Sequence, residues 1–168
     1  MKVIRYLDNN MEKILVAVIL MAMSVIIGIQ VFMRYVMSAS LSWSEEIARY
    51  LFIWLVYIGI SYGVKTRRHI KVDAAMYLFP YKLRPYVSML GDVCFLIFAI
   101  LIVFTSYDVT MSVFATGQNS PAMQIPMGYV YIAPLIGFIM VAFRLVQRLI
   151  ERYKEIQADK QGREGDAA

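Results

Sequence analysis

Four long apolar runs constrain this chain more than any other feature of its sequence. They cover residues 14–33, 47–64, 87–111 and 127–146. Each is close to the roughly 20 residues that a helix needs to cross a bilayer core of about 30 Å. Because the backbone must satisfy its own hydrogen bonds inside hydrocarbon, runs of this length are expected to be helical. The sequence therefore predicts an all-α integral membrane protein with four transmembrane helices.

The basic residues predict the orientation of these spans. Of 17 Lys and Arg, three lie at or before Lys13, six between Lys65 and Arg84, and six from Arg144 onward. The first loop is flanked only by Arg34 and Arg49, and residues 117–126 contain no Lys or Arg. Cytoplasmic loops carry an excess of Lys and Arg. Both termini and the middle loop are therefore predicted to be cytoplasmic, and the two short hairpin loops to face outward.

Composition narrows the classes of function. The chain is 60% hydrophobic and 17% charged, which is too apolar for a soluble domain of 168 residues. The net charge is +5, and the basic residues border the apolar runs. This placement indicates the lipid bilayer rather than nucleic acid as a partner. A single His69 and a single Cys94 cannot form a metal site. No nucleophile or phosphate-loop motif occurs, so the chain is predicted not to be an enzyme and to bind no cofactor.

The predicted organisation is one four-span membrane domain over residues 1–155, followed by a polar, disordered cytoplasmic tail at 156–168. The spans are expected at about 14–35, 44–64, 87–111 and 127–147. Between the second and third, the mixed apolar and polar sequence before Pro80 favours a short helix lying along the membrane surface.

The strongest polar cluster stands at the start of the second span. Ser42 and Glu45 have the spacing of a capping box, so this helix is expected to begin near Trp43. Arg49 lies four residues after Glu45 and three after Glu46, which puts the three charges on one helix face. One interpretation is a capped, salt-bridged helix end, with Arg49 holding a carboxylate. The other is a docking site for a partner protein at the outer interface.

Two further sets of residues are candidates for helix contacts. Gly59 and Gly63 are spaced for close approach of another helix, within this chain or in a partner. Asp92 lies about two turns inside the third run and could pair with Lys82 or Arg84, contact a partner helix or line an ion path. The candidate contacts at the inner interface are Arg67, Arg68, His69, Asp73 and Asp92.

Several short segments together resemble a known family. They are Phe32-Met33-Arg34-Tyr35, Trp43-Ser44-Glu45-Glu46-Ile47-Ala48-Arg49, Gly59 and His69-Ile70-Lys71-Val72-Asp73. In a four-span chain this combination resembles the small membrane subunit, of the DctQ or SiaQ type, of tripartite ATP-independent periplasmic (TRAP) transporters. The resemblance extends from Asn10 to about Glu151.

The resemblance implies a multi-pass protein of the bacterial inner membrane that works with two partners. A periplasmic binding protein would capture an organic acid, such as a sialic acid, a C4-dicarboxylate or a similar carboxylate. A large membrane subunit would carry the substrate and the sodium ions that drive symport. The small subunit would add stationary scaffold helices beside it and bind no ion itself.

Two alternatives from other classes remain open at this point. A self-contained four-span exporter would need a carboxylate embedded in the first span, whereas Glu12 precedes the first apolar run. An integral-membrane enzyme would need clustered His, Asp or Glu near an interface, and only the region around Glu45 comes close. Co-purification separates the three, because only a TRAP small subunit should bring down a much larger membrane protein.

Overall fold

The computed structural model describes residues 2–39, 41–66 and 84–165. These residues form four helices and contain no β-strand. The helices are α1 (Lys2–Tyr35), α2 (Ser42–Lys65), α4 (Arg84–Thr116) and α5 (Gly128–Gly165). Each is long and apolar enough to cross a bilayer, which confirms the predicted all-α membrane fold with four spans. The predicted surface helix before Pro80 lies outside the described residues.

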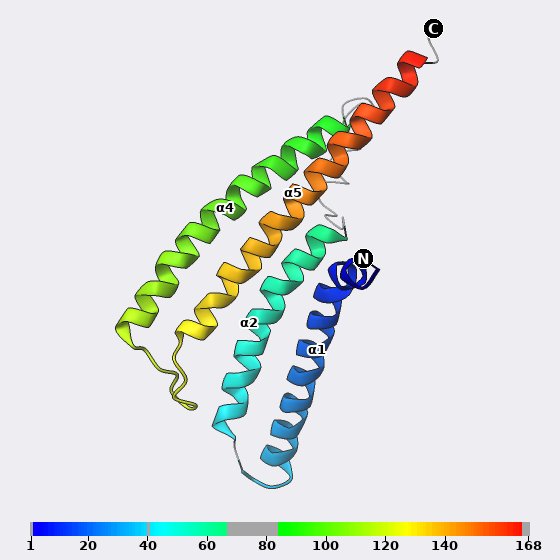
Figure 1. Ribbon diagram of the computed structural model, residues 1–168. Helices are drawn as coiled ribbons and strands as arrows, with labels where there is room; N and C mark the ends of the chain where they lie inside the picture. The colour runs from blue at the N-terminus through cyan, green and yellow to red at the C-terminus, as the bar shows by residue number, and fades with distance from the viewer. Residues whose placement is uncertain (1, 40, 67–83, 166–168) are drawn as a thin grey trace.

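The four helices stand side by side in a single row rather than around a common centre. Their order across the row is α4, α5, α2 and α1, and each packs on its immediate neighbours (Figure 1). The short connections α1–α2 and α4–α5 lie at one end of the row, called here the hairpin end (Figure 1). The opposite end holds the N-terminus and the end of α2, and is called the terminal end. Among the described residues, a row of this kind leaves two broad faces that no helix covers.

The best-packed part of the row surrounds α5. Its Phe138, Val141 and Leu145 are buried together with Val64 of α2 and Ala99 of α4. The Phe138 ring lies 6.0 Å from that of Tyr57 and 6.1 Å from that of Phe98, centroid to centroid, within the range of favourable aromatic pairs. These contacts make α5 the central support of the row.

A glycine sets the closest approach of α2 and α5. A Cβ atom added to Gly137 would lie 2.6 Å from the Cβ atom of Tyr57, which no pair of carbon atoms tolerates. Small residues let transmembrane backbones approach closely in this way. The two helices therefore touch at Tyr57 and Gly137.

The outermost helix, α1, is largely exposed. No residue in its most apolar stretch is buried within the chain, and Val18, Met21 and Val25 all have more than half of their surface exposed. A helix that is apolar on its exposed side is typical of contact with lipid or with another membrane protein.

Turn geometry corrects one detail of the predicted second helix. The N-cap of α2 is Leu41, and it makes no capping hydrogen bond through its side chain. The Ser44 hydroxyl donates to the Leu41 carbonyl at 2.7 Å, while Glu45 accepts a hydrogen bond from Gln30 of α1. The capping box predicted for Ser42 and Glu45 is therefore wrong, because Glu45 is used between helices instead.

The last helix extends far beyond the fourth apolar run. The helix α5 continues to Gly165, through much of the segment 156–168 for which the sequence predicts a disordered tail. At 38 residues it is about 57 Å long at 1.5 Å per residue, which exceeds the thickness of a bilayer with its headgroups.

Candidate functional site

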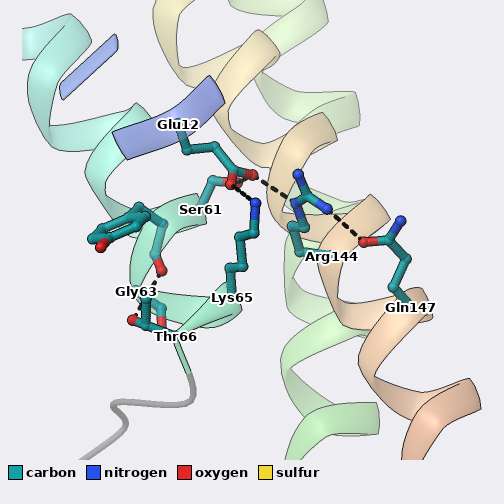
Figure 2. Close-up of polar contacts among 8 residues, drawn as sticks. Glu12, Ser61, Gly63, Lys65, Thr66, Arg144 and Gln147 are labelled. Carbon is teal, nitrogen blue, oxygen red and sulfur yellow. Dashed lines mark hydrogen bonds and ion pairs between the residues drawn. The ribbon is translucent and has the colours of Figure 1, made fainter. Parts of the chain in front are cut away.

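A buried carboxylate joins three helices at the terminal end. Glu12 of α1 is 1% exposed, and its Oε1 accepts a hydrogen bond of 2.6 Å from Nε of Arg144 on α5. Two groups of α2 complete the cluster: the Lys65 ammonium, 2.9 Å from Oε2, and the Ser61 hydroxyl, which donates to Oε1 at 3.2 Å. Figure 2 shows the carboxylate between the two cations.

The cluster is stabilised by charge and by position. Arg144 also donates from Nη1 to Oε1 of Gln147 at 2.7 Å, so its guanidinium is held in a fixed orientation between two acceptors (Figure 2). Hydrogen bonds between ionised partners are short and about twice as strong as neutral ones. Removal of one member of a buried pair costs about 3–5 kcal/mol, because a charge is left uncompensated. Glu12 therefore acts as a clamp from α1 across α2 to α5.

Sequence reasoning missed this clamp. Its three charged members, Glu12, Lys65 and Arg144, are separated by more than fifty residues along the chain, so no local spacing connects them. One signal was available: Glu12 precedes the first apolar run, Lys65 ends the second and Arg144 stands near the end of the fourth. The predicted topology brings all three positions to the same depth of the bilayer.

Asp92 forms a second clamp between α4 and α5. It is 8% exposed, and its Oδ2 lies 3.4 Å from Nε of Arg148 and 3.6 Å from Nε of Arg152. Its partners thus belong to another helix of the same chain. The sequence suggested Lys82 or Arg84 as partners; Lys82 and the side chain of Arg84 lie outside the described residues.

A third buried carboxylate fixes the hairpin end. Glu46 is 6% exposed, and its Oε2 accepts hydrogen bonds from the backbone N–H groups of Ala122 and Met123, at 3.0 and 2.8 Å. Its Oε1 accepts a hydrogen bond of 2.5 Å from the Tyr50 hydroxyl. Glu46 thus ties the start of α2 to the connection between α4 and α5.

The predicted cluster of Glu45, Glu46 and Arg49 is divided in the structure. Glu45 is exposed and accepts a hydrogen bond of 2.7 Å from Gln30 on α1. Arg49 is also exposed and forms no ion pair within the described part of the chain. The interpretation that Arg49 holds a carboxylate is wrong there, since Glu46 takes its hydrogen bonds from Tyr50 and the turn backbone.

A groove of about 620 Å³ opens between α2 and α5 toward the hairpin end. Its polar end is formed by Glu46, Arg49 and Tyr50, and its walls are mainly apolar. The wall residues are Phe52, Ile53, Val56, Tyr57 and Ile60 of α2 with Pro121, Met127, Val130, Tyr131 and Pro134.

The remaining candidates have different outcomes. Nothing in the described chain lies within 4 Å of a Cβ atom added at Gly59 or Gly63, so this pair does not face a close helix of its own chain. Arg67, Arg68, His69 and Asp73 lie outside the described residues. Within the described ranges, no group of three or more His, Cys, Asp or Glu could hold a metal ion.

Comparison with known proteins places the chain in a family. Residues 23–155 match the family described as tripartite ATP-independent periplasmic transporters, DctQ component. The chain belongs to the DctQ family. It is thus a non-enzymatic membrane subunit of a TRAP transporter and a multi-pass protein of the bacterial inner membrane.

Individual DctQ relatives cover the chain to different extents. A putative TRAP transporter small permease protein of Haemophilus influenzae is 28% identical over 155 residues, 92% of each chain. The isethionate TRAP transporter permease protein DctMQ of Oleidesulfovibrio alaskensis is 31% identical over 153 residues; the match covers 88% of this chain but 24% of the relative. The small permease protein DctQ of a C4-dicarboxylate TRAP transporter from Vibrio cholerae is 32% identical over 100 residues, 60% of this chain and 43% of the relative.

The structure corrects one argument made from the sequence. The position of Glu12 ahead of the first apolar run counted against a self-contained exporter. The structure places Glu12 inside α1 and within its candidate span, which begins at Asn10. The exporter is excluded by the family instead.

Proposed function

We propose that this chain is the stationary scaffold subunit of a sodium-coupled TRAP transporter that imports an organic acid. The observation that carries the proposal is the row of unbroken helices, each joined to a neighbour by a buried carboxylate. Ion and substrate sites in secondary transporters are built on discontinuous helices with unwound backbone. The described spans contain no discontinuous helix of this kind. This favours a scaffold role for the chain, with sodium and substrate bound by the large subunit.

The proposed orientation has the hairpin end in the periplasm and both termini in the cytoplasm. It is supported by the basic residues of the terminal end, where Lys65, Arg144, Arg148 and Arg152 gather. Cysteine labelling tests it after Cys94→Ala. A cysteine at Asn119 should react with an impermeant maleimide in intact cells, and one at Gln161 should not. External labelling at Gln161 would reverse the orientation.

The proposed partners are a large permease subunit and a periplasmic binding protein. The DctQ relatives carry names that refer to C4-dicarboxylates, sialic acid and isethionate. Their common feature is a small organic anion, and we infer a substrate of that class. The binding protein must approach the periplasmic face, where the exposed Glu45 carboxylate is the proposed docking contact. Glu46 is unsuited to that role because three donors already occupy its oxygens.

Reconstitution of the three components tests the proposal. Uptake into proteoliposomes should require the large subunit, the binding protein and a sodium gradient together. This chain alone should give none, and uptake by the chain alone would overturn the scaffold role. Glu45→Lys should reduce uptake while the membrane complex still assembles. The control is Arg34→Gln, which changes an exposed residue of α1 at the same hairpin end of the row and should leave uptake unchanged.

A further inference from the structure

The groove between α2 and α5 is apolar along most of its length and polar at one end. Its apolar end lies at Tyr57 and Ile60, beside the contact of Tyr57 with Gly137. From there its lining continues toward the hairpin end and reaches Glu46 and Arg49. An apolar channel with a charged end matches an amphiphilic ligand rather than a wholly apolar or wholly polar one.

The length of the groove fits an extended hydrocarbon chain. Its lining on α2 runs from Glu46 to Ile60, about 21 Å at 1.5 Å per residue. This length matches half of a bilayer with its headgroups, about 20–22 Å. An acyl chain of about 16 carbons in extended form has a similar length, so the groove is long enough to hold one along its apolar walls.

The polar end supplies one accessible cation. Arg49 is exposed and makes no ion pair in the described part of the chain, while the neighbouring Glu46 is engaged by Tyr50 and two backbone N–H groups. A guanidinium binds phosphate through two parallel hydrogen bonds. A phosphate beside Arg49 would lie at the headgroup level of the leaflet at the hairpin end.

We propose that this groove is a binding site for one glycerophospholipid of the leaflet at the hairpin end. The phosphate pairs with Arg49, and one acyl chain lies along Ile53 and Val56 as far as Ile60, beside the contact of Tyr57 with Gly137. The bound chain fills a gap that side chains leave between α2 and α5. The site depends on neither the orientation of the protein nor the presence of other subunits. The lipid proposal can therefore be confirmed or disproved independently of the proposed transport role.

Native mass spectrometry of the purified, delipidated full chain titrated with phosphatidylglycerol tests the site. The wild type should bind one lipid tightly. Arg49→Gln should weaken that binding about tenfold or more, the equivalent of about 1.4 kcal/mol, and Arg49→Lys should restore part of it. Val56→Trp, which fills the groove, should also reduce binding, and Ile53→Trp provides a second test if that variant does not fold. Arg34→Gln is the control, since it removes an exposed arginine at the hairpin end outside the groove.

Several results would overturn the proposal. One is wild-type protein that takes up no phosphatidylglycerol, and another is equal binding by Arg49→Gln and Arg34→Gln. Photo-crosslinking from p-benzoylphenylalanine at Ile53 separates lipid from a protein occupant in the complex with the large subunit. The expected product carries the mass of one phospholipid. A crosslink to the large subunit instead would identify the groove as a protein interface and exclude the lipid site.

Discussion

The two ends of the helix row are held together by different chemistry. At the terminal end, carboxylates pair with cationic side chains of other helices, as Glu12 does with Lys65 and Arg144. At the hairpin end, side chains bond to the backbone: Glu46 accepts from two N–H groups of the turn, and the Thr110 hydroxyl of α4 lies 2.8 Å from the Tyr131 carbonyl of α5.

The difference follows from which hydrogen-bonding partners each end offers to a buried carboxylate. The turn between α4 and α5 has backbone N–H groups outside the helices, and a buried carboxylate can satisfy them. At the terminal end α1, α4 and α5 continue past the clamps, so their backbone groups there are already paired. Charged side chains supply the partners there, because Lys and Arg are concentrated at that end. A single row of helices needs such clamps, since its buried cluster surrounds α5 and leaves an outer helix such as α1 with little packing to set its register.

The largest expected effect is the loss of the Glu12 clamp. Glu12→Gln removes the negative charge between Lys65 and Arg144 and should lower the free energy of unfolding by about 3–5 kcal/mol. Thermal unfolding in detergent measures it, with the exposed neighbour Lys13→Gln as the control. Because buried pairs are often replaceable by apolar groups, Glu12→Met with Arg144→Met should recover part of the loss. Wild-type stability of Glu12→Gln would mean that the clamp contributes nothing.

Loss of the carboxylate at the hairpin end should have a smaller and more local effect. Glu46→Gln weakens two hydrogen bonds to a charged acceptor, each worth about 1.5–3 kcal/mol, but water can replace them in part at the membrane surface. Hydrogen exchange at the amides of Ala122 and Met123 should accelerate. Glu45→Gln, which changes the adjacent exposed carboxylate, should leave those amides unchanged. Equal exchange in both variants would show that Glu46 does not hold the turn.

The Asp92 clamp should contribute less again. Its distances to Arg148 and Arg152, 3.4 and 3.6 Å, exceed those of good charge-assisted hydrogen bonds, and the arginines are partly exposed. Asp92→Asn should destabilise the chain by about 1 kcal/mol, in the range of partly solvated ion pairs. Asp108→Asn makes the same change at an exposed position of the same helix and should be neutral. If the two variants unfold at the same temperature, Asp92 is not a clamp.

The smallest effect is expected where the sequence suggested close packing. Gly63→Ala meets nothing within 4 Å in the described chain, so its unfolding temperature should equal or slightly exceed that of the wild type, since Ala favours helix by up to about 1 kcal/mol. Gly137→Ala places a Cβ atom against Tyr57 and should be destabilising. Gly63→Leu tests the other possibility, and reduced co-purification with the large subunit would show that the glycine pair faces that partner.

Much of the fold could be predicted from local features of the chain. The four spans follow from the length of the apolar runs, and the family from the motifs near Trp43 and His69. The candidate site was predicted less well. Glu45, Glu46 and Arg49 were grouped by helical spacing, but the structure gives each a different environment. Spacing on one helix cannot show which side chain meets the turn of another hairpin 76 residues away.

The sequence by itself therefore determined that the chain is a membrane protein, where its four membrane-spanning helices lie and where its charges gather, because hydrophobic length and charge are additive along the chain. Only the tertiary structure decided that the helices form a row, that Glu12 meets Lys65 and Arg144, and that Arg49 is left at the polar end of a groove. Those facts depend on which helices become neighbours and at what register. Neighbours and register are determined by contacts between residues far apart in sequence. These contacts include the packing of Gly137 on Tyr57 and the pairing of buried charges.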